Sequence, residues 1–217
     1  MTADPIPHEY PLSTSPQRPD RAAQRDFRRR YALAAATEVF VSRGYHATTM
    51  DEIAQRAGYT KPILYKQFSG KLDLYLAVLQ DHIDTLTESL RQALASTSIN
   101  KQRVRAAVQT YFDFVDHETH GFRLVFEFSA ASEPSVQLRI GRATDACVDT
   151  VCEAVTHDSG LNPQQARLLA AGLVGASQVA AQYWLDTGRA IPKSDAIDAV
   201  IRLCWGGLSQ VPLHPTE

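Results

Sequence analysis

The chain has 217 residues, 44% of them hydrophobic and 21% charged, so it can form one or two domains and its composition excludes a wholly disordered protein. A formal net charge of −2 excludes a uniformly basic nucleic-acid-binding protein but leaves room for a local basic surface. From Arg18 to Lys71 there are 11 basic and 5 acidic residues, whereas from Asp81 to Glu217 there are 11 and 16. A basic front part therefore precedes an acidic remainder.

Signals for export, membrane insertion and disulfide bonding are missing from the sequence pattern. No uncharged apolar run approaches the roughly 18 residues that span a bilayer. Residues 1–19 contain five prolines and no apolar segment, unlike a signal peptide. Cys147, Cys152 and Cys204 have no CxxC spacing, so we expect small core residues rather than a disulfide or zinc site. We expect a cytoplasmic protein with no metal or cofactor.

The apolar residues recur at helical spacing along most of the chain. The clearest stripe steps by three and four residues from Leu72 to Leu90, and no run alternates as a strand would. The sequence therefore predicts an all-α fold of about nine helices, at residues 21–43, 50–57, 61–67, 71–95, 101–117, 121–131, 134–157, 163–187 and 193–208.

Several helix ends carry recognisable capping residues. Thr49 and Glu52 have the spacing of a capping box, and Asn162 before Pro163 is a typical helix start. Gly44 follows the first apolar stripe, where a helix end favours a residue with positive φ. These signals support the predicted boundaries.

Two short helices, 50–57 and 61–67, surround Gly58 and predict a helix-turn-helix. In this motif the second helix enters the major groove of DNA. Leu64 and Phe68 share a face and should pack inward, which leaves the other face for bases and phosphates. The predicted DNA contacts are Thr48, Thr49, Thr60, Lys61, Pro62, Ile63, Tyr65, Lys66, Gln67 and Lys71.

Three runs of the front part, 43–54, 57–68 and 69–74, closely resemble the DNA-binding domain of TetR-type transcription regulators. The resemblance implies a non-enzymatic regulator with nine helices, a two-fold dimer through the last two long helices, and a ligand cavity in the C-terminal domain. We accordingly expect a disordered tail at 1–20, a DNA-binding domain at 21–70, a ligand-binding and dimerisation domain at 71–211 and a flexible end at 212–217. The expected partners are an inverted-repeat operator in double-stranded DNA, a second subunit and a small effector, with no membrane.

A narrower resemblance concerns the C-terminal part. It rests on residues 111–115, 121–127, 172–177, 183–186 and 205–209, which are similar to actinobacterial fatty-acid-synthesis regulators of this family. The resemblance implies control of fatty acid synthesis genes and an effector that is a long-chain acyl-coenzyme A.

Aromatic residues gather in the segment 111–128, which holds six of the 16 phenylalanines and tyrosines. A helix that is apolar on all sides is either buried or lines a cavity, and ordinary core packing remains the alternative. The predicted ligand contacts are Tyr111, Phe112, Val115, Phe122, Val125, Phe126, Cys147 and Val151. Arg123, Arg139 and Arg142 are candidates for the coenzyme phosphates, with nothing to choose among them.

Helix 163–187 is rich in alanine and glycine, which allow close approach of a second helix. The predicted dimer interface comprises Gly172, Gly175, Ala176, Trp184, Trp205 and Leu208.

Two other interpretations remain open. The same scaffold can sense a drug-like or aromatic compound, for which Asp113, Glu118 and Glu127 would supply cavity acids. His117 and His120 have a spacing that a metal site can use, although a solvated helix end explains them as well.

Overall fold

In a computed structural model, the structure describes residues 21–117, 119–126, 133–158 and 161–206. These residues form nine helices and no strand, which confirms the predicted all-α fold. The helices are α1 (Arg21–Ala47), α2 (Met50–Arg56), α3 (Lys61–Tyr65), α4 (Lys71–Ala95), α5 (Asn100–His117), α6 (Thr119–Phe126), α7 (Pro134–Asp158), α8 (Pro163–Asp186) and α9 (Lys193–Gly206).

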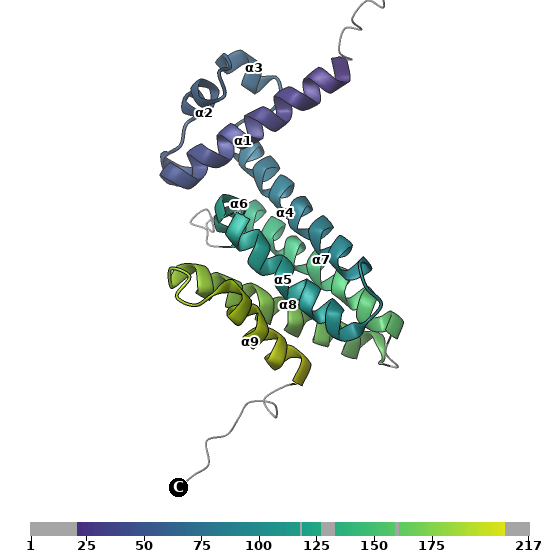
Figure 1. Cartoon of the computed structure of the whole chain (residues 1–217). Helices are drawn as coiled ribbons and strands as arrows, with labels where there is room; N and C mark the ends of the chain where they lie inside the picture. The colour runs from purple at the N-terminus through teal and green to yellow at the C-terminus, as the bar shows by residue number, and fades with distance from the viewer. Residues whose placement is uncertain (1–20, 118, 127–132, 159–160, 207–217) are drawn as a thin grey trace, which may run out of the picture.

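The helices form a small head and a larger bundle (Figure 1). Helices α1, α2 and α3 make the head, and α4 runs from the head into the bundle of α5, α7, α8 and α9. The short helix α6 lies at the end of the bundle next to α1, whereas the α4–α5 connection lies at the end farthest from the head. One helix therefore connects the two parts along its full length.

Local sequence signals explain most of the boundaries. Gly44 has φ +77°, as predicted, but the chain only kinks there and remains helical to Ala47. The capping box of α2 is confirmed, since Thr49 Oγ1 accepts from the Glu52 amide at 3.3 Å and the Glu52 carboxylate accepts from the Thr49 amide at 2.9 Å. Asn162 caps α8 in the same way.

Besides α1, helices α3 and α6 differ from the predicted bounds by two residues or more at an end within the described part. Helix α3 ends at Tyr65, two residues early, and its N-cap residue Thr60 makes no side-chain capping hydrogen bond. Helix α6 begins at Thr119 rather than at residue 121, and its predicted end at 131 lies outside the described residues. With few stabilising hydrogen bonds of its own, α3 depends on the packing of its buried face.

Buried hydrophobic residues form two cores. The first joins α1–α3 to the first half of α4, and also includes Leu124 and Val125 of α6 and Val136 and Ala143 of α7. The second joins the second half of α4 to α5, α7, α8 and α9. The predicted domain boundary at residue 70 therefore precedes a helix that contributes to both cores, and that boundary stays a prediction.

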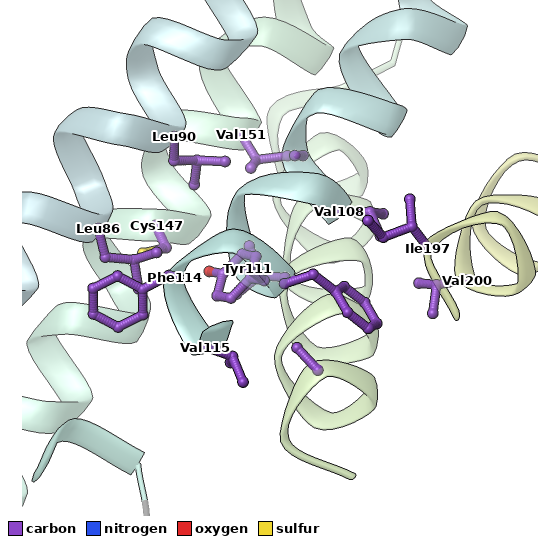
Figure 2. Packing of buried hydrophobic residues seen from close by; sticks show 14 of the residues in the cluster. Leu86, Leu90, Val108, Tyr111, Phe114, Val115, Cys147, Val151, Ile197 and Val200 are labelled. Carbon is purple, nitrogen blue, oxygen red and sulfur yellow. The ribbon is translucent and has the colours of Figure 1, made fainter. Parts of the chain in front are cut away.

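The second core is dense around the middle of α5 (Figure 2). Tyr111 points toward Leu86 of α4 and Cys147 of α7, and Leu90 lies beside Val151. The ring centroids of Phe112 and Trp184 are 5.6 Å apart. Cys147 is buried while Cys152 and Cys204 are partly buried, and all three are free thiols, as the sequence predicted.

Truncating Phe112 to alanine tests the second core. Because Phe112 is fully buried, Phe112→Ala is expected to lower the free energy of unfolding by about 3–5 kcal/mol. Urea denaturation followed by circular dichroism at one fixed protein concentration measures the change. Phe27→Ala is the control, because Phe27 is 66% exposed and its loss should change stability by less than about 0.5 kcal/mol. Equal effects of the two substitutions would contradict the assignment of Phe112 to the core.

Candidate nucleic-acid interface and ligand cavity

Helix α3 presents one polar face to solvent and one apolar face to the head. Leu64 and Phe68 are buried, which confirms the predicted inward face. The outward residues Thr60, Lys61, Pro62, Tyr65 and Lys66 are exposed, and Ile63 and Gln67 are partly exposed. The predicted DNA-contacting residues of this helix are therefore brought together on one surface, except that the side-chain oxygen of Gln67 is buried without a hydrogen-bond partner among the described residues.

The two threonines before α2 differ from each other. Thr48 is buried and donates its hydroxyl to the carbonyl of Gly44 at 2.7 Å, so its side chain does not face solvent as the prediction requires. Thr49 is exposed, and its hydroxyl takes part in the capping box of α2. Only Thr49 can present its side chain to a phosphate.

Lys61 is held by a carboxylate from the preceding helix. Its Nζ lies 2.9 Å from Asp51 Oδ2, and the hydrogen bond to Asp51 raises the pKa of Lys61. Both side chains are more than half exposed, so the pair is easily separated. The predicted contact of Lys61 with a DNA base therefore requires that Lys61 leave Asp51.

Lys71 has a structural role that the sequence did not reveal. Its Nζ donates to the carbonyl oxygens of Tyr45, His46 and Thr48 at 2.9, 3.2 and 2.9 Å, and it lies 4.6 Å from the centre of the Tyr45 ring. A cation at this position satisfies carbonyls at the C-terminal end of α1 and favours their partial negative charge. The first residue of α4 thus fixes the end of α1, and the predicted phosphate contact of Lys71 stays a prediction.

The start of α1 carries further positive charge beside the helix-turn-helix. Arg25, Arg28, Arg29 and Arg30 are all exposed. The guanidinium carbon of Arg29 lies 4.9 Å from the centre of the Phe68 ring. This contact joins α1 to the residues that follow α3. Together the exposed arginines give the head a basic surface that phosphates can contact.

An apolar cavity of about 220 Å³ opens at the end of the bundle farthest from the head. It is lined by residues of five helices and the α7–α8 connection: Leu94, Asn100, Arg103, Val104, Val151, Ala154, Val155, Leu161, Leu169, Leu173 and Trp205. None of these lining residues is an aspartate or glutamate. The walls therefore suit an uncharged apolar group, with Arg103 as the one lining cation.

Of the predicted ligand contacts, only Val151 lines this cavity. Tyr111, Phe112, Val115 and Cys147 are buried in the second core, and Val125 is buried in the first. The side chains of Phe122 and Phe126 lie outside the described part of the structure. The periodic pattern identified buried positions, but a periodic pattern is the same for a core and for the wall of a cavity.

The centre of the second core contains polar groups. Burial raises the pKa of Tyr111 and of the Cys147 thiol, and a hydrogen bond joins the two side chains. Thr87 Oγ1 lies 4.0 Å from Cys147 Sγ. Both Tyr111 and Cys147 therefore remain protonated at neutral pH and act as neutral polar groups within apolar surroundings.

Of the acids proposed for a drug-sensing cavity, Asp113 is the one within the described residues, and it does not line the apolar cavity. Asp113 lies 2.6 Å from Lys193 Nζ, and hydrogen bonds from Lys193 and Arg189 lower the pKa of Asp116. Glu118 and Glu127 lie outside the described residues. Within the described part, no group of three potential ligands could hold a metal ion, and His117 Nδ1 contacts the Asp113 carbonyl at 2.9 Å.

Helix α8 carries an exposed apolar stripe. Leu168, Val179 and Tyr183 are 73%, 63% and 70% exposed, and Gly172 lies between them at helical spacing. Gly175 and Ala176 are partly exposed on the same side of the helix. By length and composition alone α8 could cross a membrane, a criterion that core helices of soluble proteins also meet. The stripe is suited to contact with another apolar surface.

The structure places only some of the predicted interface residues on this stripe. Trp184 is 5% exposed, and its indole N–H donates to the Ile191 carbonyl at 2.9 Å, so it belongs to the core and not to the stripe. Trp205 is half exposed at the edge of the cavity. Leu208 lies outside the described residues. Tyr183, next to Trp184, is the aromatic residue on the stripe that sequence reasoning missed.

The head and the bundle each match a known family model. Residues 32–78 match that of the bacterial regulatory proteins of the tetR family, and residues 100–207 match the tetracyclin repressor-like C-terminal domain. The HTH-type transcriptional activator FasR of Mycolicibacterium smegmatis is 52% identical over 189 residues, which cover 87% of this chain and 86% of FasR. The chain belongs to the TetR family. It is thus a DNA-binding transcription regulator and not an enzyme.

Two solved structures with bound acyl-coenzyme A share this fold. FadR from Bacillus subtilis in complex with stearoyl-CoA superimposes with a TM-score of 0.71 at 16% identity, covering 82% of this chain and 98% of FadR. AibR in complex with isovaleryl coenzyme A and operator DNA has a TM-score of 0.64 at 22% identity, covering 81% and 97% of the two chains. The ligand is stearoyl-CoA in the FadR structure and isovaleryl coenzyme A in the AibR structure.

Two lysine variants separate DNA contact from stabilisation of the head. Lys66 is exposed, so Lys66→Gln is expected to reduce the slope of log K against log salt by about 1 while leaving stability unchanged. Lys71→Gln is expected to lower the free energy of unfolding by about 1–3 kcal/mol, because three carbonyls lose their cation. Fluorescence anisotropy on operator DNA from 50 to 200 mM salt and urea denaturation provide the two measurements. An unchanged slope for Lys66→Gln, or an unchanged urea midpoint for Lys71→Gln, would refute the corresponding role.

Proposed function

We propose that the protein is a cytoplasmic homodimer that regulates fatty acid biosynthesis genes, and that a long-chain acyl-coenzyme A bound in the bundle changes its affinity for operator DNA. The observation that carries the proposal is the apolar cavity with no carboxylate in its described lining and Arg103 among its walls. The 52% identity to FasR and the acyl-coenzyme A ligands of FadR and AibR support it.

The dimensions of the cavity bear on how an acyl chain enters. Ligand sites generally measure about 300–1,000 Å³, so a cavity of 220 Å³ accommodates only part of a long chain. Val151 in its wall lies beside Leu90, and the next residues inward are Leu86, Cys147 and Tyr111 (Figure 2). A long chain that advances from the cavity toward the head therefore has to part these side chains. Of these residues, Val151, Cys147 and Tyr111 belong to the set that the sequence predicted as ligand contacts.

Movement in the bundle can reach the head through α6 and α4. The backbone of α6 comes so close to α4 at Gly121 that an added Cβ would lie 2.4 Å from His82 Nδ1. His82 Nε2 in turn lies 3.2 Å from Thr37 Oγ1 of α1. A ligand that shifts α6 or α4 thereby favours one orientation of the head, and its effect on DNA affinity equals the effect of DNA on ligand affinity.

The apolar stripe on α8 accounts for the dimer. A two-fold axis brings identical surfaces together, so a stripe of glycine, alanine and apolar residues can pack against its own copy. Two heads related by that axis would read the two halves of an inverted repeat, with one α3 in each major groove. Ligand-dependent movement of α4 would change the spacing of the heads.

Filling the cavity tests the effector. Wild-type protein is expected to change its affinity for DNA from upstream of its own gene or the fatty acid synthase gene on addition of palmitoyl-coenzyme A, with an effect that grows from C8 to C20. Ala154→Trp should weaken this response at least about tenfold while sparing DNA binding, because the added ring occupies the cavity. Thr156→Trp, an exposed position two residues further along α7, is the matched control. Fluorescence anisotropy gives both affinities.

Tight DNA binding that no acyl-coenzyme A alters would reject the proposed effector and leave the regulator in place. Displacement by a cationic or aromatic drug in the same assay would then establish the drug-sensing alternative.

A charge on the stripe tests the dimer. Val179→Glu is expected to convert the protein to a monomer, since two buried carboxylates would face each other across the axis. Loss of dimers should also reduce affinity for an inverted repeat at least about 100-fold, toward the affinity for one half-site. Analytical ultracentrifugation and anisotropy measure the two effects, with Gln109→Glu on the exposed surface of α5 as the charge-matched control. A dimeric Val179→Glu protein would rule out this stripe as the interface.

A further inference from the structure

We infer that the anionic head group of a coenzyme A thioester docks on Lys101, Arg202 and Trp205, at the end of the bundle farthest from the DNA-binding head. The inference rests on the proposed function, because it takes an acyl-coenzyme A as the ligand. It adds the orientation of the ligand, with its head group away from the DNA-binding head. It also names the side chains that distinguish a thioester of coenzyme A from a free fatty acid.

The first observation is that a second hollow adjoins the apolar cavity. This hollow, here called the rim hollow, measures about 360 Å³ and is lined by Lys101, Ile201, Arg202, Trp205 and Gly206. Trp205 lines both spaces, and Lys101 follows Asn100, which lines the cavity. A ligand with its acyl chain in the cavity can therefore pass Trp205 and place its polar end in the rim hollow.

The second observation concerns charge. Lys101 and Arg202 are exposed, and neither makes an ion pair or hydrogen bond with the described residues. By contrast, Arg91 is paired with Glu88 and Arg105 with Asp198. No carboxylate lies among the described lining of the rim hollow. Two cations without an acid partner on one rim form a site for phosphate groups.

The opposite side of the cavity has a different charge pattern. The hollow there includes Glu153 with Arg91 and Arg103, and the adjacent surface carries Asp149 and Glu153. Carboxylates repel the phosphates of coenzyme A, so the charge distribution directs the head group toward Lys101 and Arg202.

The third observation is the indole of Trp205. It is half exposed, with a hydrophobic cavity on one side and two cations on the other. Aromatic side chains stack on nucleobases, and cations beside them bind the attached phosphates. The combination of an apolar pocket, an indole and two cations corresponds to the acyl, adenine and phosphate parts of the ligand.

The arginines suggested from the sequence are less suitable. Arg139 Nη1 donates to Gln80 Oε1 at 2.6 Å in a groove that also contains Asp73, Asp81 and Asp84. Three carboxylates in one groove disfavour phosphate binding there. Arg142 is likewise on α7, away from the residues that line the cavity.

The test compares palmitoyl-coenzyme A with palmitate on the full-length protein by isothermal titration calorimetry. Wild-type protein is expected to prefer palmitoyl-coenzyme A. The double variant Lys101→Gln/Arg202→Gln should lose about tenfold in affinity for it per cation, with palmitate affinity unchanged. Arg139→Gln/Arg142→Gln removes the same charge and should keep the preference. Palmitoyl-coenzyme A should also protect Trp205 from acrylamide quenching, since Trp184 is already buried.

The outcomes separate the two levels of the proposal. A wild-type preference for palmitoyl-coenzyme A that survives in Lys101→Gln/Arg202→Gln would overturn the rim hollow as the head-group site and leave the proposed function standing. The rim hollow would also be overturned as the head-group site if Arg139→Gln/Arg142→Gln lost the preference for palmitoyl-coenzyme A while Lys101→Gln/Arg202→Gln kept it. A wild-type protein that binds neither compound would overturn the proposed effector itself.

Discussion

The rest of the structure depends on α4 being one uninterrupted helix that packs in two cores. Leu74, Val78 and Ile83 lie in the core of the head, whereas Leu86 and Leu94 lie in the core of the bundle. A rigid helix shared in this way cannot move at one end without a change of packing at the other, because protein cores are close-packed. The position of α3 and the shape of the apolar cavity are therefore linked through α4, and α7 is a second helix with residues in both cores.

The two ends of α4 carry the functional consequences. At its start, Lys71 holds the carbonyls at the end of α1, so the orientation of the helix-turn-helix follows the orientation of α4. Near its end, Leu94 lines the apolar cavity. Between them His82 contacts α1 through Thr37 and lies against the backbone of α6 at Gly121. The apolar cavity and the helix-turn-helix are thereby connected through side-chain and backbone contacts of α4.

Apolar residues of the bundle have three different roles. Phe112 and Trp184 stabilise the interior, the residues around Leu173 enclose the cavity, and Val179 and Tyr183 form the exposed stripe. Four of these residues, Leu173, Val179, Tyr183 and Trp184, lie on α8 within a few turns of one another. A ligand that alters the packing of one face of α8 consequently acts on the helix that presents the proposed dimer surface. The same helix is thus available to coordinate the two subunits.

The sequence by itself determined the helices, their main caps and the two-sided nature of α3. Thr49, Asn162 and Gly44 act through bonds to residues a few positions away, so local pattern is sufficient to predict them. Leu64 and Phe68 were predictable as buried for the same reason, since helical period places them on one face. Local pattern together with family resemblance was also sufficient to identify a DNA-binding regulator.

Only the tertiary structure decided where the ligand cavity opens and what each long-range side chain contacts. Helical period marks Phe112, Trp184 and Leu173 alike as apolar, although the first two are in the core and the third lines the cavity. The contacts of Lys71 with the end of α1, and the position of Lys101 in the same hollow as Trp205, join residues distant along the chain. Such contacts depend on how helices cross, which composition and spacing do not encode, and for that reason the sequence offered no choice among Arg123, Arg139 and Arg142 as candidates for the coenzyme phosphates.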